Sequence, residues 1–435
     1  MVRTVAWDGS TDSMLMALWA VFWFIITFSI LVVLHEGGHF LVARAFGVHV
    51  HEFMIGLPGP SLRFHGKETD YGVTAIPLGG YVRISGMEPG PEDPNLGPVL
   101  AYVTRVGTTT LDQVSRDLGM GLGDADAALT VLVDWNAVSR EGAEDDESYA
   151  AHFDSALADD PEALLAKARS TTYRGLSTWK RVLVLCAGVA VNLVAAVLVF
   201  VLVLTLYGIP TATLTVDTTL PGGGAAKAGI TKGDTITAIA NQQLRTWDEL
   251  LTAISKHAPG ESVTVAVRSK SGATHQVTVV LGSSASKKPL LGIQVATENV
   301  RQTLGQALTM SFTYVGLVFQ AIAGFFSPRT FQSSIQQSTG VIGVAVMAQQ
   351  AAGRGPIDYA FLVALLSLSL GIMNILPIPP LDGGKVAIEI VEGLSRRQLS
   401  RKLSIGLSLA GTLVLVTLIG YLMYADVVRF VIHGG

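Results

Sequence analysis

Two histidines and a glutamate stand together in one short stretch, His35-Glu36-Gly37-Gly38-His39. On a helix, residues four apart lie on one face about one turn apart, so both imidazoles can reach a single metal ion. Glu36 lies beside the first histidine and would project toward a water on that ion. This HExxH pattern is typical of zinc proteases, in which Zn²⁺ lowers the pKa of the water and the glutamate takes its proton.

The surroundings of this stretch favour the metal interpretation. An uncharged apolar run, residues 14–34, precedes it, and residues 40–43 are apolar again. Ionisable groups in hydrocarbon are costly unless they have partners, which disfavours the alternative of a histidine pair packed against lipid headgroups. The two adjacent glycines cost a helix about 1–2 kcal/mol relative to alanine. They leave room for another backbone, or a substrate, to approach the metal.

A catalytic zinc takes a third protein ligand and keeps one position for water. The candidate is Asp382, in the segment NILPIPPLDGGK at 374–385, which follows the third apolar run as His35 follows the first. The three prolines of this segment prevent a regular helix just before Asp382. Irregular backbone at membrane depth is tolerated where it is buried in protein or lines a wet cavity. The alternative is an aspartate that only caps a helix.

The elements that must hold these residues are apolar helices. Of the 435 residues, 49% are hydrophobic and 15% charged, and the mean hydropathy of +0.47 excludes an ordinary soluble globular protein. The first run is too long for the apolar core of a signal peptide, and no small-residue cleavage pattern follows it. Four uncharged stretches approach or exceed the ~20 residues of a spanning helix, namely 14–34, 182–207, 359–381 and 403–425.

Charged residues between these runs predict their orientation. Lys and Arg occupy 180–181, and four more stand within 396–402. By the positive-inside rule both loops face the cytoplasm. The segment 208–357 and both termini then face outward, and His35 and Asp382 meet at the same, cytoplasmic depth.

Two different segments separate the first two runs. Residues 48–87, ending in YGVTAIPLGGYVRISGM, alternate apolar with polar residues or glycine and predict short β-hairpins at the membrane surface. Residues 88–179 hold 17 Asp and Glu against 6 Lys and Arg. They predict a solvated cytoplasmic insertion, disordered in part, with helix in SALADDPEALLAKARS. A regulatory or partner-binding element is the alternative, and the sequence does not choose between the two.

Residues 211–300 have the pattern of a soluble domain. The segment AAKAGITKGDTITAIANQ, an amphipathic helix at 246–256 and alternating strands at 262–268 and 274–281 resemble a circularly permuted PDZ domain. PLLGIQV at 289–295 matches its carboxylate-binding loop. Such domains add an extended peptide to a sheet edge and bind its C-terminal carboxylate through backbone N–H groups. The alternative is a generic small β-rich domain. The expected peptide-loop residues are Leu291, Gly292 and Ile293.

Together these motifs resemble the site-2 protease family of zinc intramembrane metalloproteases, of the regulator-of-sigma-E protease type with one PDZ domain. The resemblance covers most of the chain apart from 88–179. It depends on HEGGH at 35–39, PLGGYV at 77–82, WKR…AG…N at 179–192, the permuted PDZ pattern and NILPIPPLDGG at 374–384.

The resemblance implies a role for each matching residue. His35, His39 and Asp382 would ligate one catalytic Zn²⁺, and Glu36 would be the general base. Asn374 would contact the unwound substrate backbone or the oxyanion.

The resemblance also implies that one strand pairs with the substrate at membrane depth. This role has a physical basis, because a peptide bond in a helix is shielded and its freed N–H and C=O groups must be paired again after unwinding. The strand residues are Gly79, Gly80, Tyr81 and Val82.

Three positions depart from the family pattern. Lys385 stands where a histidine often follows LDGG, Val189 where a proline often follows AG, and Val341 where a proline is common before the third span. None of them is an expected ligand. The two absent prolines bear on helix kinks and gating, and Lys385 bears on the surroundings of Asp382.

We therefore expect a polytopic α-helical membrane protein with about four transmembrane helices, membrane-associated β-hairpins and one extracytoplasmic α+β PDZ domain. The expected segments are a first transmembrane helix with HExxH (14–47), the β-hairpin region (48–87), the acidic cytoplasmic insertion (88–179), a second transmembrane helix (180–208), the PDZ domain (211–300), an amphipathic interfacial segment (302–356), a third transmembrane helix with LDG (357–386) and a fourth (401–426).

The expected function is intramembrane zinc endopeptidase activity in a bacterial inner or plasma membrane, with the active site toward the cytoplasm. By resemblance, the substrates are single-span proteins already cut by a site-1 protease, such as anti-sigma factors or leftover signal peptides. Nucleic acid is not expected, because the basic clusters are those that set topology. A catalytically silent PDZ scaffold is the first alternative, and the intact four-residue set argues against it. A metal transporter is the second alternative. It would need polar residues in the second and fourth spans, where only Asn192 stands out, and we interpret Asn192 as a helix–helix contact.

Overall fold

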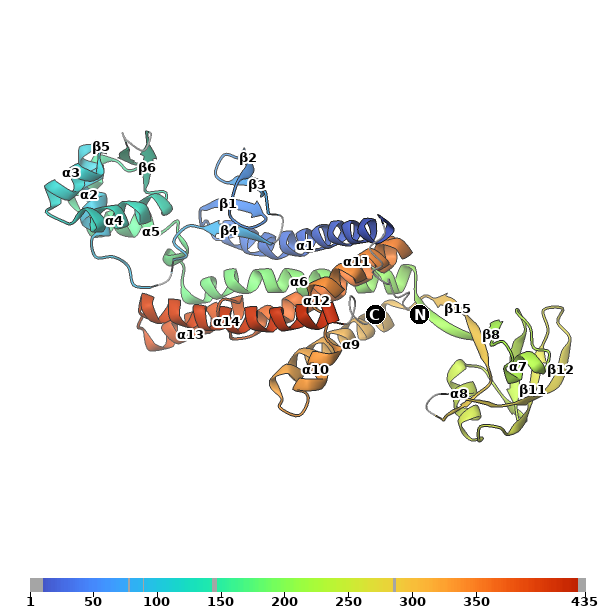
Figure 1. Ribbon diagram of the computed structural model, residues 1–435. Helices are drawn as coiled ribbons and strands as arrows, with labels where there is room; N and C mark the ends of the chain where they lie inside the picture. The colour runs from blue at the N-terminus through green and yellow to red at the C-terminus, as the bar shows by residue number, and fades with distance from the viewer. Residues whose placement is uncertain (1–10, 77–78, 89, 143–146, 285–286, 429–435) are drawn as a thin grey trace. The chain divides into compact units, whose positions relative to one another are not determined.

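The computed structural model describes residues 11–76, 79–88, 90–142, 147–284 and 287–428 (Figure 1). Pro77 and Leu78 of the PLGGYV motif, and residues 143–146 of the acidic insertion, lie outside the described residues. The chain divides into two compact units. Unit 1 comprises residues 1–200 and 310–435, and unit 2 comprises residues 201–309.

Within the described residues, five helices are long and apolar enough to cross a membrane, one more than the four expected. Helices suit this setting because each satisfies its own backbone N–H and C=O groups. The additional candidate is Leu304–Phe326, which we expected to be amphipathic; it includes α9 (Leu304–Ala323) and η3 (Gly324–Phe326). The other four are α1 (Thr11–Ala45), α6 (Thr178–Leu206), α12 (Pro356–Ile375) and α14 (Arg401–Asp426).

Helices α1 and α12 run in the same direction. Near their N-terminal ends, the Trp23 and Tyr359 rings lie 5.0 Å apart, and the Thr27 and Tyr359 hydroxyls lie 2.9 Å apart. Beyond their apolar parts, His35 of α1 and Asp382 meet. Both helices therefore bring their functional residues to one level.

Helices α6 and α14 run in the opposite direction. Phe200, near the end of α6, contacts Phe361, near the start of α12, with ring centres 5.1 Å apart. The first half of α14 lies against the segment that follows α12, because Gly411 directly contacts the Pro379 carbonyl. Asp426, the last residue of α14, accepts a hydrogen bond from the Gly343 N–H at the start of α11 (Val341–Arg354).

A four-stranded sheet follows α1. Its strands are β1 (Val50–Ile55), β2 (Ser61–His65), β3 (Asp70–Thr74) and β4 (Gly80–Ile84), in the order β2-β3-β1-β4. β1 is parallel to β3 and antiparallel to β4, so the region is more than a pair of simple hairpins. β4 lies at an edge of this sheet.

The described residues of the acidic insertion are folded, not disordered. Leu100, Leu129, Leu132 and Trp135 are among the residues of a continuous buried core. The elements are α2 (Leu96–Val106), β5 (Thr108–Thr109), α3 (Leu111–Leu118), α4 (Leu122–Asp134), β6 (Val138–Glu141), β7 (Ser148–Ala151), η1 (Ser155–Asp159), α5 (Pro161–Arg169) and η2 (Tyr173–Gly175).

The insertion has the element order of a winged helix-turn-helix. Helices α3 and α4 are joined by the three-residue turn 119–121, in which Gly119 adopts φ 64°, a left-handed conformation that glycine tolerates. The strands β5, β7 and β6 form one antiparallel sheet in that order.

Unit 2 has the strands and helices expected of a permuted PDZ-like domain. β11 (Ser262–Arg268) coincides with an expected strand. β12 (Thr274–Val280) is one residue shorter than expected at its end, and α8 (Trp247–Ser255) is one residue shorter at each end. The sheet order is β12-β11-β9-β8-β15. The other elements are β8 (Ile209–Thr219), α7 (Gly224–Lys227), β9 (Thr235–Ile239), β10 (Gln242–Gln243), β13 (Gly282–Ser283), β14 (Pro289–Leu290) and β15 (Ile293–Val300).

Candidate metal centre

Three of the expected functional side chains come together in one buried group. His35 Nε2 lies 2.9 Å and His39 Nε2 lies 3.1 Å from Asp382 Oδ2, and the two Nε2 atoms are 3.4 Å apart. The residues are only 8%, 6% and 7% exposed. Among the described residues, this is the group of histidine, cysteine and acidic side chains that could hold a metal ion.

The spacing of these atoms fits a tetrahedral metal. With zinc bonds of about 2.0–2.1 Å, two ligand atoms at a tetrahedral angle lie about 3.3–3.4 Å apart. The Nε2–Nε2 distance of 3.4 Å has this value, and the carboxylate oxygen lies slightly closer to both. Two imidazoles and one carboxylate are also a ligand set found in catalytic zinc sites.

The other nitrogen of each imidazole, Nδ1, lies within hydrogen-bonding distance of a residue of α6. His39 Nδ1 lies 2.8 Å from the Val184 carbonyl, which can only accept, so Nδ1 carries the proton and Nε2 is free for a metal. His35 Nδ1 lies 3.3 Å from the Asn192 side-chain amide.

The Asn192 amide is fully buried, and its Oδ1 has no hydrogen-bond partner in the described structure. After a half-turn of this amide, Oδ1 would accept a hydrogen bond from His35 Nδ1–H, which leaves His35 Nε2 free. Metal-bound histidines are usually held by such an outer hydrogen bond, so this unpaired oxygen also fits a metal on His35 Nε2.

One face of α6 is shaped to receive the imidazoles. Val184, Gly188 and Asn192 follow one another at spacings of four, so they share a helix face. A Cβ atom on Gly188 would lie 2.5 Å from His39 Nε2, and one on Gly38 would lie 2.5 Å from the Ala187 carbonyl oxygen. The second glycine of HEGGH thus allows another backbone to approach, as expected, whereas Gly37 has no atom within 4 Å of such a Cβ.

Asp382 is positioned by a break between two helices. α12 ends at Ile375, and Asp382 begins α13 (Asp382–Ser395). The proline-rich residues between them form no helix, as expected. The second carboxylate oxygen, Oδ1, lies 3.5 Å from Lys385 Nζ. Lys385, a departure from the family pattern, therefore gives the free side of this carboxylate a positive partner.

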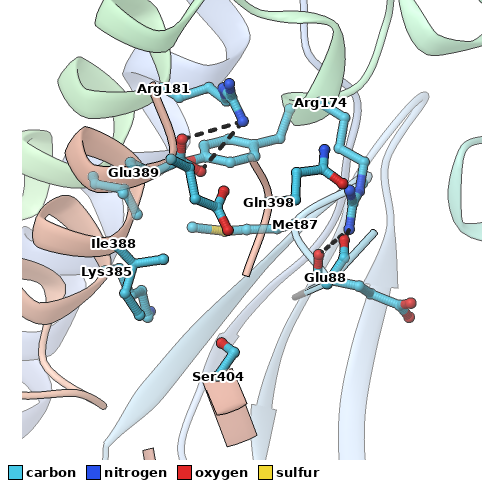
Figure 2. Close-up of a pocket in the computed structure, with 14 residues that line it drawn as sticks. Met87, Glu88, Arg174, Arg181, Lys385, Ile388, Glu389, Gln398 and Ser404 are labelled. Carbon is cyan, nitrogen blue, oxygen red and sulfur yellow. Dashed lines mark hydrogen bonds and ion pairs between the residues drawn. The ribbon is translucent and has the colours of Figure 1, made fainter. Parts of the chain in front are cut away.

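A second polar cluster joins Glu389 of α13 to Arg181 of α6 and Tyr173 of η2. Glu389 forms an ion pair with Arg181 at 3.1 Å and accepts a hydrogen bond from the Tyr173 hydroxyl at 3.1 Å. Burial and the neighbouring Glu389 raise the pKa of Tyr173 well above its usual range, so this hydroxyl stays protonated and donates. Figure 2 shows these groups around a cavity of about 110 Å³ that Lys385 also lines.

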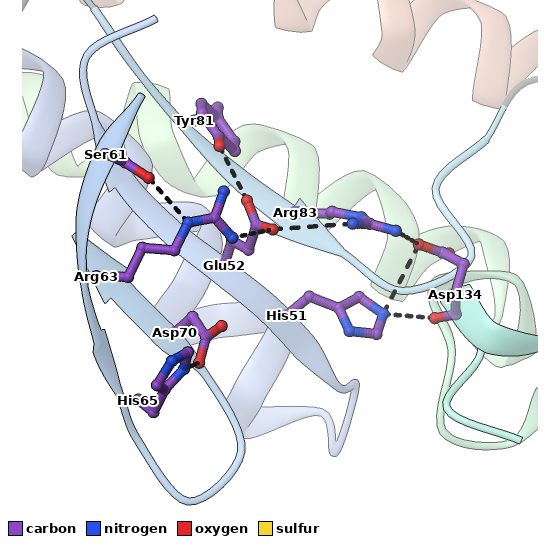
Figure 3. A network of polar contacts seen from close by, with 9 residues as sticks. All are labelled: His51, Glu52, Ser61, Arg63, His65, Asp70, Tyr81, Arg83 and Asp134. Atoms are coloured by element: carbon purple, nitrogen blue, oxygen red, sulfur yellow. Dashed lines mark hydrogen bonds and ion pairs between the residues drawn. The ribbon is translucent and has the colours of Figure 1, made fainter. Parts of the chain in front are cut away.

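The expected substrate strand lies directly beside the glutamate of HEGGH. A Cβ on Gly80, the first residue of β4, would lie 2.5 Å from Val32 and 3.8 Å from Cγ of Glu36. Gly79 adopts φ 98°, and the Tyr81 hydroxyl donates to Glu52 of β1 at 2.9 Å (Figure 3). Val82 pairs with Phe53 of β1.

The other expected site residues have no described contact with the metal group. Asn374 is buried in the last turn of α12, and its amide donates to the Leu370 carbonyl at 3.1 Å. In unit 2 the Leu291 side chain is part of the core, Gly292 adopts φ 79°, and Ile293 begins β15. Their roles as substrate and peptide contacts remain predictions.

Two residues near the metal group were not predicted as parts of the site. Asn192, interpreted from the sequence as a helix–helix contact, lies against His35, and Gly188 makes room for both rings. The spacing of four between Gly188 and Asn192 was the available signal. It could not show which of the other helices this face meets.

Comparisons with known proteins agree with this geometry. The model of peptidase family M50 matches residues 23–418. Zinc metalloprotease RasP of Bacillus licheniformis is 26% identical over 417 residues, covering 93% of this chain and 98% of that protein. A Streptococcus pneumoniae protein with "zinc metalloprotease" in its name is 29% identical over 430 residues, covering 93% and 98%.

Two further matches differ in how much of the chain they cover. "Probable protease eep" of Enterococcus faecalis is 28% identical over 426 residues, covering 94% of this chain and 98% of that protein. The crystal structure of the PDZ domain of an SdrC-like protein from Listeria monocytogenes is 19% identical, covers 20% of this chain and 90% of that one, and has a TM-score of 0.18. The family match extends over nearly the whole chain and confirms the resemblance to the site-2 proteases. This chain, a membrane protein and a zinc metalloendopeptidase, belongs to peptidase family M50.

Proposed function

We propose that this enzyme hydrolyses a peptide bond within or near the transmembrane segment of single-span membrane proteins, as the second cut of regulated intramembrane proteolysis. The observation that carries the proposal is the placement of the metal group. His35, His39 and Asp382 are buried among helices apolar enough to span a membrane, and an open sheet edge begins beside Glu36. An active site for soluble substrates would not need to lie among helices apolar enough to span a membrane.

In the proposed mechanism, His35, His39 and Asp382 hold one Zn²⁺ ion. Zinc supplies Lewis acidity, which acidifies water and polarises the scissile carbonyl. Glu36 takes a proton from the attacking water and delivers it to the leaving amine. Val184 and Asn192 keep the imidazoles in the tautomer with Nε2 free. Asn374 is the proposed contact to the unwound substrate or the oxyanion.

The β4 edge is the proposed docking position for the unwound substrate. Within the described strands β4 pairs with β1 alone, so its outer N–H and C=O groups can pair with an added strand. A hollow of about 390 Å³ follows this edge; we call it the β4 hollow. It is lined by Val82, Arg83, Ile84, Met87, Glu88, Asp134 and Lys385.

The outer part of the same sheet supports a position at the membrane surface. Leu62 pairs with Val73 and Phe64 with Tyr71 across β2 and β3, and all four side chains are exposed. The Tyr71 ring also contacts Phe40 of α1, with ring centres 6.0 Å apart. This exposed apolar face therefore continues from a candidate spanning helix, where the lipid bilayer would cover it.

We propose four transmembrane helices, with the metal group toward the cytoplasm and unit 2 outside a bacterial plasma membrane. The alternating directions of α1, α6, α12 and α14 support this arrangement, together with the basic residues at 180–181 and 396–402. Tyr314 of α9 contacts Phe200 near the end of α6, and Gly343 of α11 contacts Asp426 at the end of α14. In the proposed arrangement both contacts lie toward the outer side, which supports an oblique, re-entrant α9.

Unit 2 is the proposed reader of the trimmed substrate. A PDZ-like loop at Leu291, Gly292 and Ile293 would receive the new C-terminus left by a site-1 protease. Nucleic acid is not a proposed partner, although the insertion has a helix-turn-helix order. DNA-binding modules present Lys and Arg to the phosphates, whereas α4 carries Asp124, Asp126 and Asp134 and no basic residue.

Cleavage of a trimmed substrate by the purified enzyme tests this function. A single-span substrate without its outer domain is incubated with the wild type, Glu36→Ala, or the wild type with a zinc chelator. We expect a cut within the span for the wild type alone, restored after chelation by added Zn²⁺. Equal cleavage in all three samples would contradict the mechanism. Zinc-free protein with no cleavage of any substrate would favour the PDZ scaffold.

A further inference from the structure

We propose that the acidic insertion is part of the substrate-binding apparatus, and that Asp134 is the positioning residue that fixes the far end of β4. This inference rests on the proposed function, in which the outer edge of β4 pairs with the substrate. It assigns a role to the segment that contains none of the motifs on which the resemblance to the family depends.

Asp134, the last residue of α4, connects the insertion to β4 (Figure 3). It is only 7% exposed. Its carboxylate accepts hydrogen bonds from the Gly86 N–H at 2.9 Å and from Arg83 at 3.2 Å. Its carbonyl accepts one from the Ser85 hydroxyl at 2.6 Å, and His51 Nε2 lies 2.6 Å from the same oxygen. One residue of the insertion thus contacts β4, the turn that follows it, and β1.

These contacts stabilise the end of the β1–β4 pairing at which the register is irregular. The register shifts between Val50 and Glu52 of β1, so His51 has no partner in β4. Such a bulge interrupts the ladder and bends the strand. The Asp134 carbonyl bonds to this bulged His51, and the carboxylate bonds to Arg83 on the opposite strand. A partly buried charge-assisted contact therefore replaces ladder bonds that the bulge removes.

The two ends of β4 are consequently held by different parts of the molecule. Gly80 packs against α1 beside Glu36, and the turn after Ile84 is bonded to the insertion. Five strand residues at a rise of about 3.4 Å extend about 17 Å. Between these ends the β4 hollow is lined by Lys385 on one side and reaches Asp134. A substrate strand added along the whole of β4 would start beside Glu36, at Gly80, and end at the insertion.

The free outer edge makes this anchoring important for binding. β4 has one strand neighbour, so its tilt and register depend on β1 and on its end contacts. A strand edge binds an added strand more tightly when it is already ordered, because ordering it on binding would weaken affinity. Loss of the Asp134 contacts should therefore raise KM far more than it lowers kcat.

Kinetics of full-length variants with the trimmed single-span substrate test this proposal. Removing hydrogen bonds to a buried charged group should cost about ten-fold in KM, so we expect that rise for Asp134→Ala, with kcat within two-fold and zinc content unchanged. Asp134→Asn keeps an acceptor for Gly86 and should recover most of the wild-type KM. Asp126→Ala, an exposed acid on the same helix, is the control and should match the wild type.

Amide hydrogen exchange gives a readout that does not need activity. In Asp134→Ala the amides of residues 80–86 that are bonded to β1 or to Asp134 should exchange at least ten-fold faster, with the core of the insertion around Leu129 unchanged. If the whole insertion loses protection in Asp134→Ala, the variant Ser85→Ala is used as the test instead. Ser85→Ala removes one hydrogen bond to Asp134 from the side of the sheet, and we expect its KM to rise.

Three results would overturn the proposal. The first is that Asp134→Ala keeps the wild-type KM and the wild-type amide exchange. The second is that Asp134→Ala unfolds and Ser85→Ala keeps the wild-type KM. The third is that Asp126→Ala and Asp134→Ala raise KM equally. A wild type that cleaves no single-span substrate would contradict the proposed function instead. The exchange of residues 80–86 would still decide whether Asp134 positions β4.

Discussion

The metal group and β4 lie side by side, but they are held in different ways. The metal group is enclosed: its residues are each less than a tenth exposed, and α1 and α6 approach closely at Gly38 and Gly188. β4 is held at its ends, by α1 at Gly80 and by Asp134 of the insertion, and its outer edge faces the β4 hollow. The comparison teaches that chemistry and substrate docking should fail separately, the first in kcat or zinc binding and the second in KM.

The largest expected effect is on chemistry alone. Glu36→Gln removes the group that takes the proton from water but keeps the size of the side chain. We expect kcat to fall by about 10²–10⁴-fold, with zinc content and KM close to wild type. Turnover and metal analysis of the same preparation check this. Glu298→Gln, an exposed carboxylate of unit 2, is the control, and a comparable loss there would remove the case for Glu36.

A smaller effect is expected on the metal affinity. Asn192→Ala removes the outer partner of His35 Nδ1, so the ring loses its preferred orientation and tautomer. Loss of such a partner typically weakens metal binding by about 10–100-fold. Competition with a chromogenic chelator measures this change directly. Thr205→Ala, a polar residue near the far end of α6, serves as the control; an unchanged zinc affinity in Asn192→Ala would mean that the amide only packs the helices.

Substrate docking should respond to one methyl group on β4. In Gly80→Ala the new Cβ would lie 2.5 Å from Val32 and 2.8 Å from the Met54 carbonyl oxygen, so the strand must move away from α1. Overpacking of this kind costs about 1–3 kcal/mol. We expect KM to rise about five-fold or more, with kcat less affected. Gly59→Ala, where the nearest atom is 4.0 Å away, is the matched control, and equal KM values for both variants would contradict a role for this contact.

The contrast between enclosed and open regions also explains what the sequence could predict. His35, Glu36 and His39 form a local pattern on one helix, and the prolines before Asp382 mark a break that only a buried polar group would need. These signals depend on neighbouring residues. The role of Asn192 depends on which helix faces α6, and no local pattern contains that information.

The two inserted regions show the same limit. Unit 2 was predictable because its strands alternate with period two, as at 262–268. The insertion was expected to be partly disordered because of its excess of acids, and the helical pattern at Leu96, Val99, Leu100 and Val103 was not used. These residues have the i, i+3, i+4, i+7 spacing of one helix face, and all are buried. Periodicity was the better guide here, since most of the described acids of the insertion are exposed, whereas Asp134 is buried.

The smallest expected effect separates folding of the insertion from its docking on β4. Thr110 and Gln113 form a capping box at the start of α3: the hydroxyl accepts from the Gln113 N–H, and the Gln113 side chain accepts from the Thr110 N–H. Thr246 and Glu249 form the same box at the start of α8 in unit 2. Thr110→Ala should lower the local free energy of unfolding of the insertion by about 1 kcal/mol, seen as about five-fold faster amide exchange in α3. Thr246→Ala should do the same in α8 and leave α3 unchanged.

Because Asp134 lies at the opposite end of α4, KM should stay within two-fold of wild type in both variants. A KM that rises with Thr110→Ala as steeply as with Asp134→Ala would mean that β4 depends on the overall stability of the insertion and not on the Asp134 contacts.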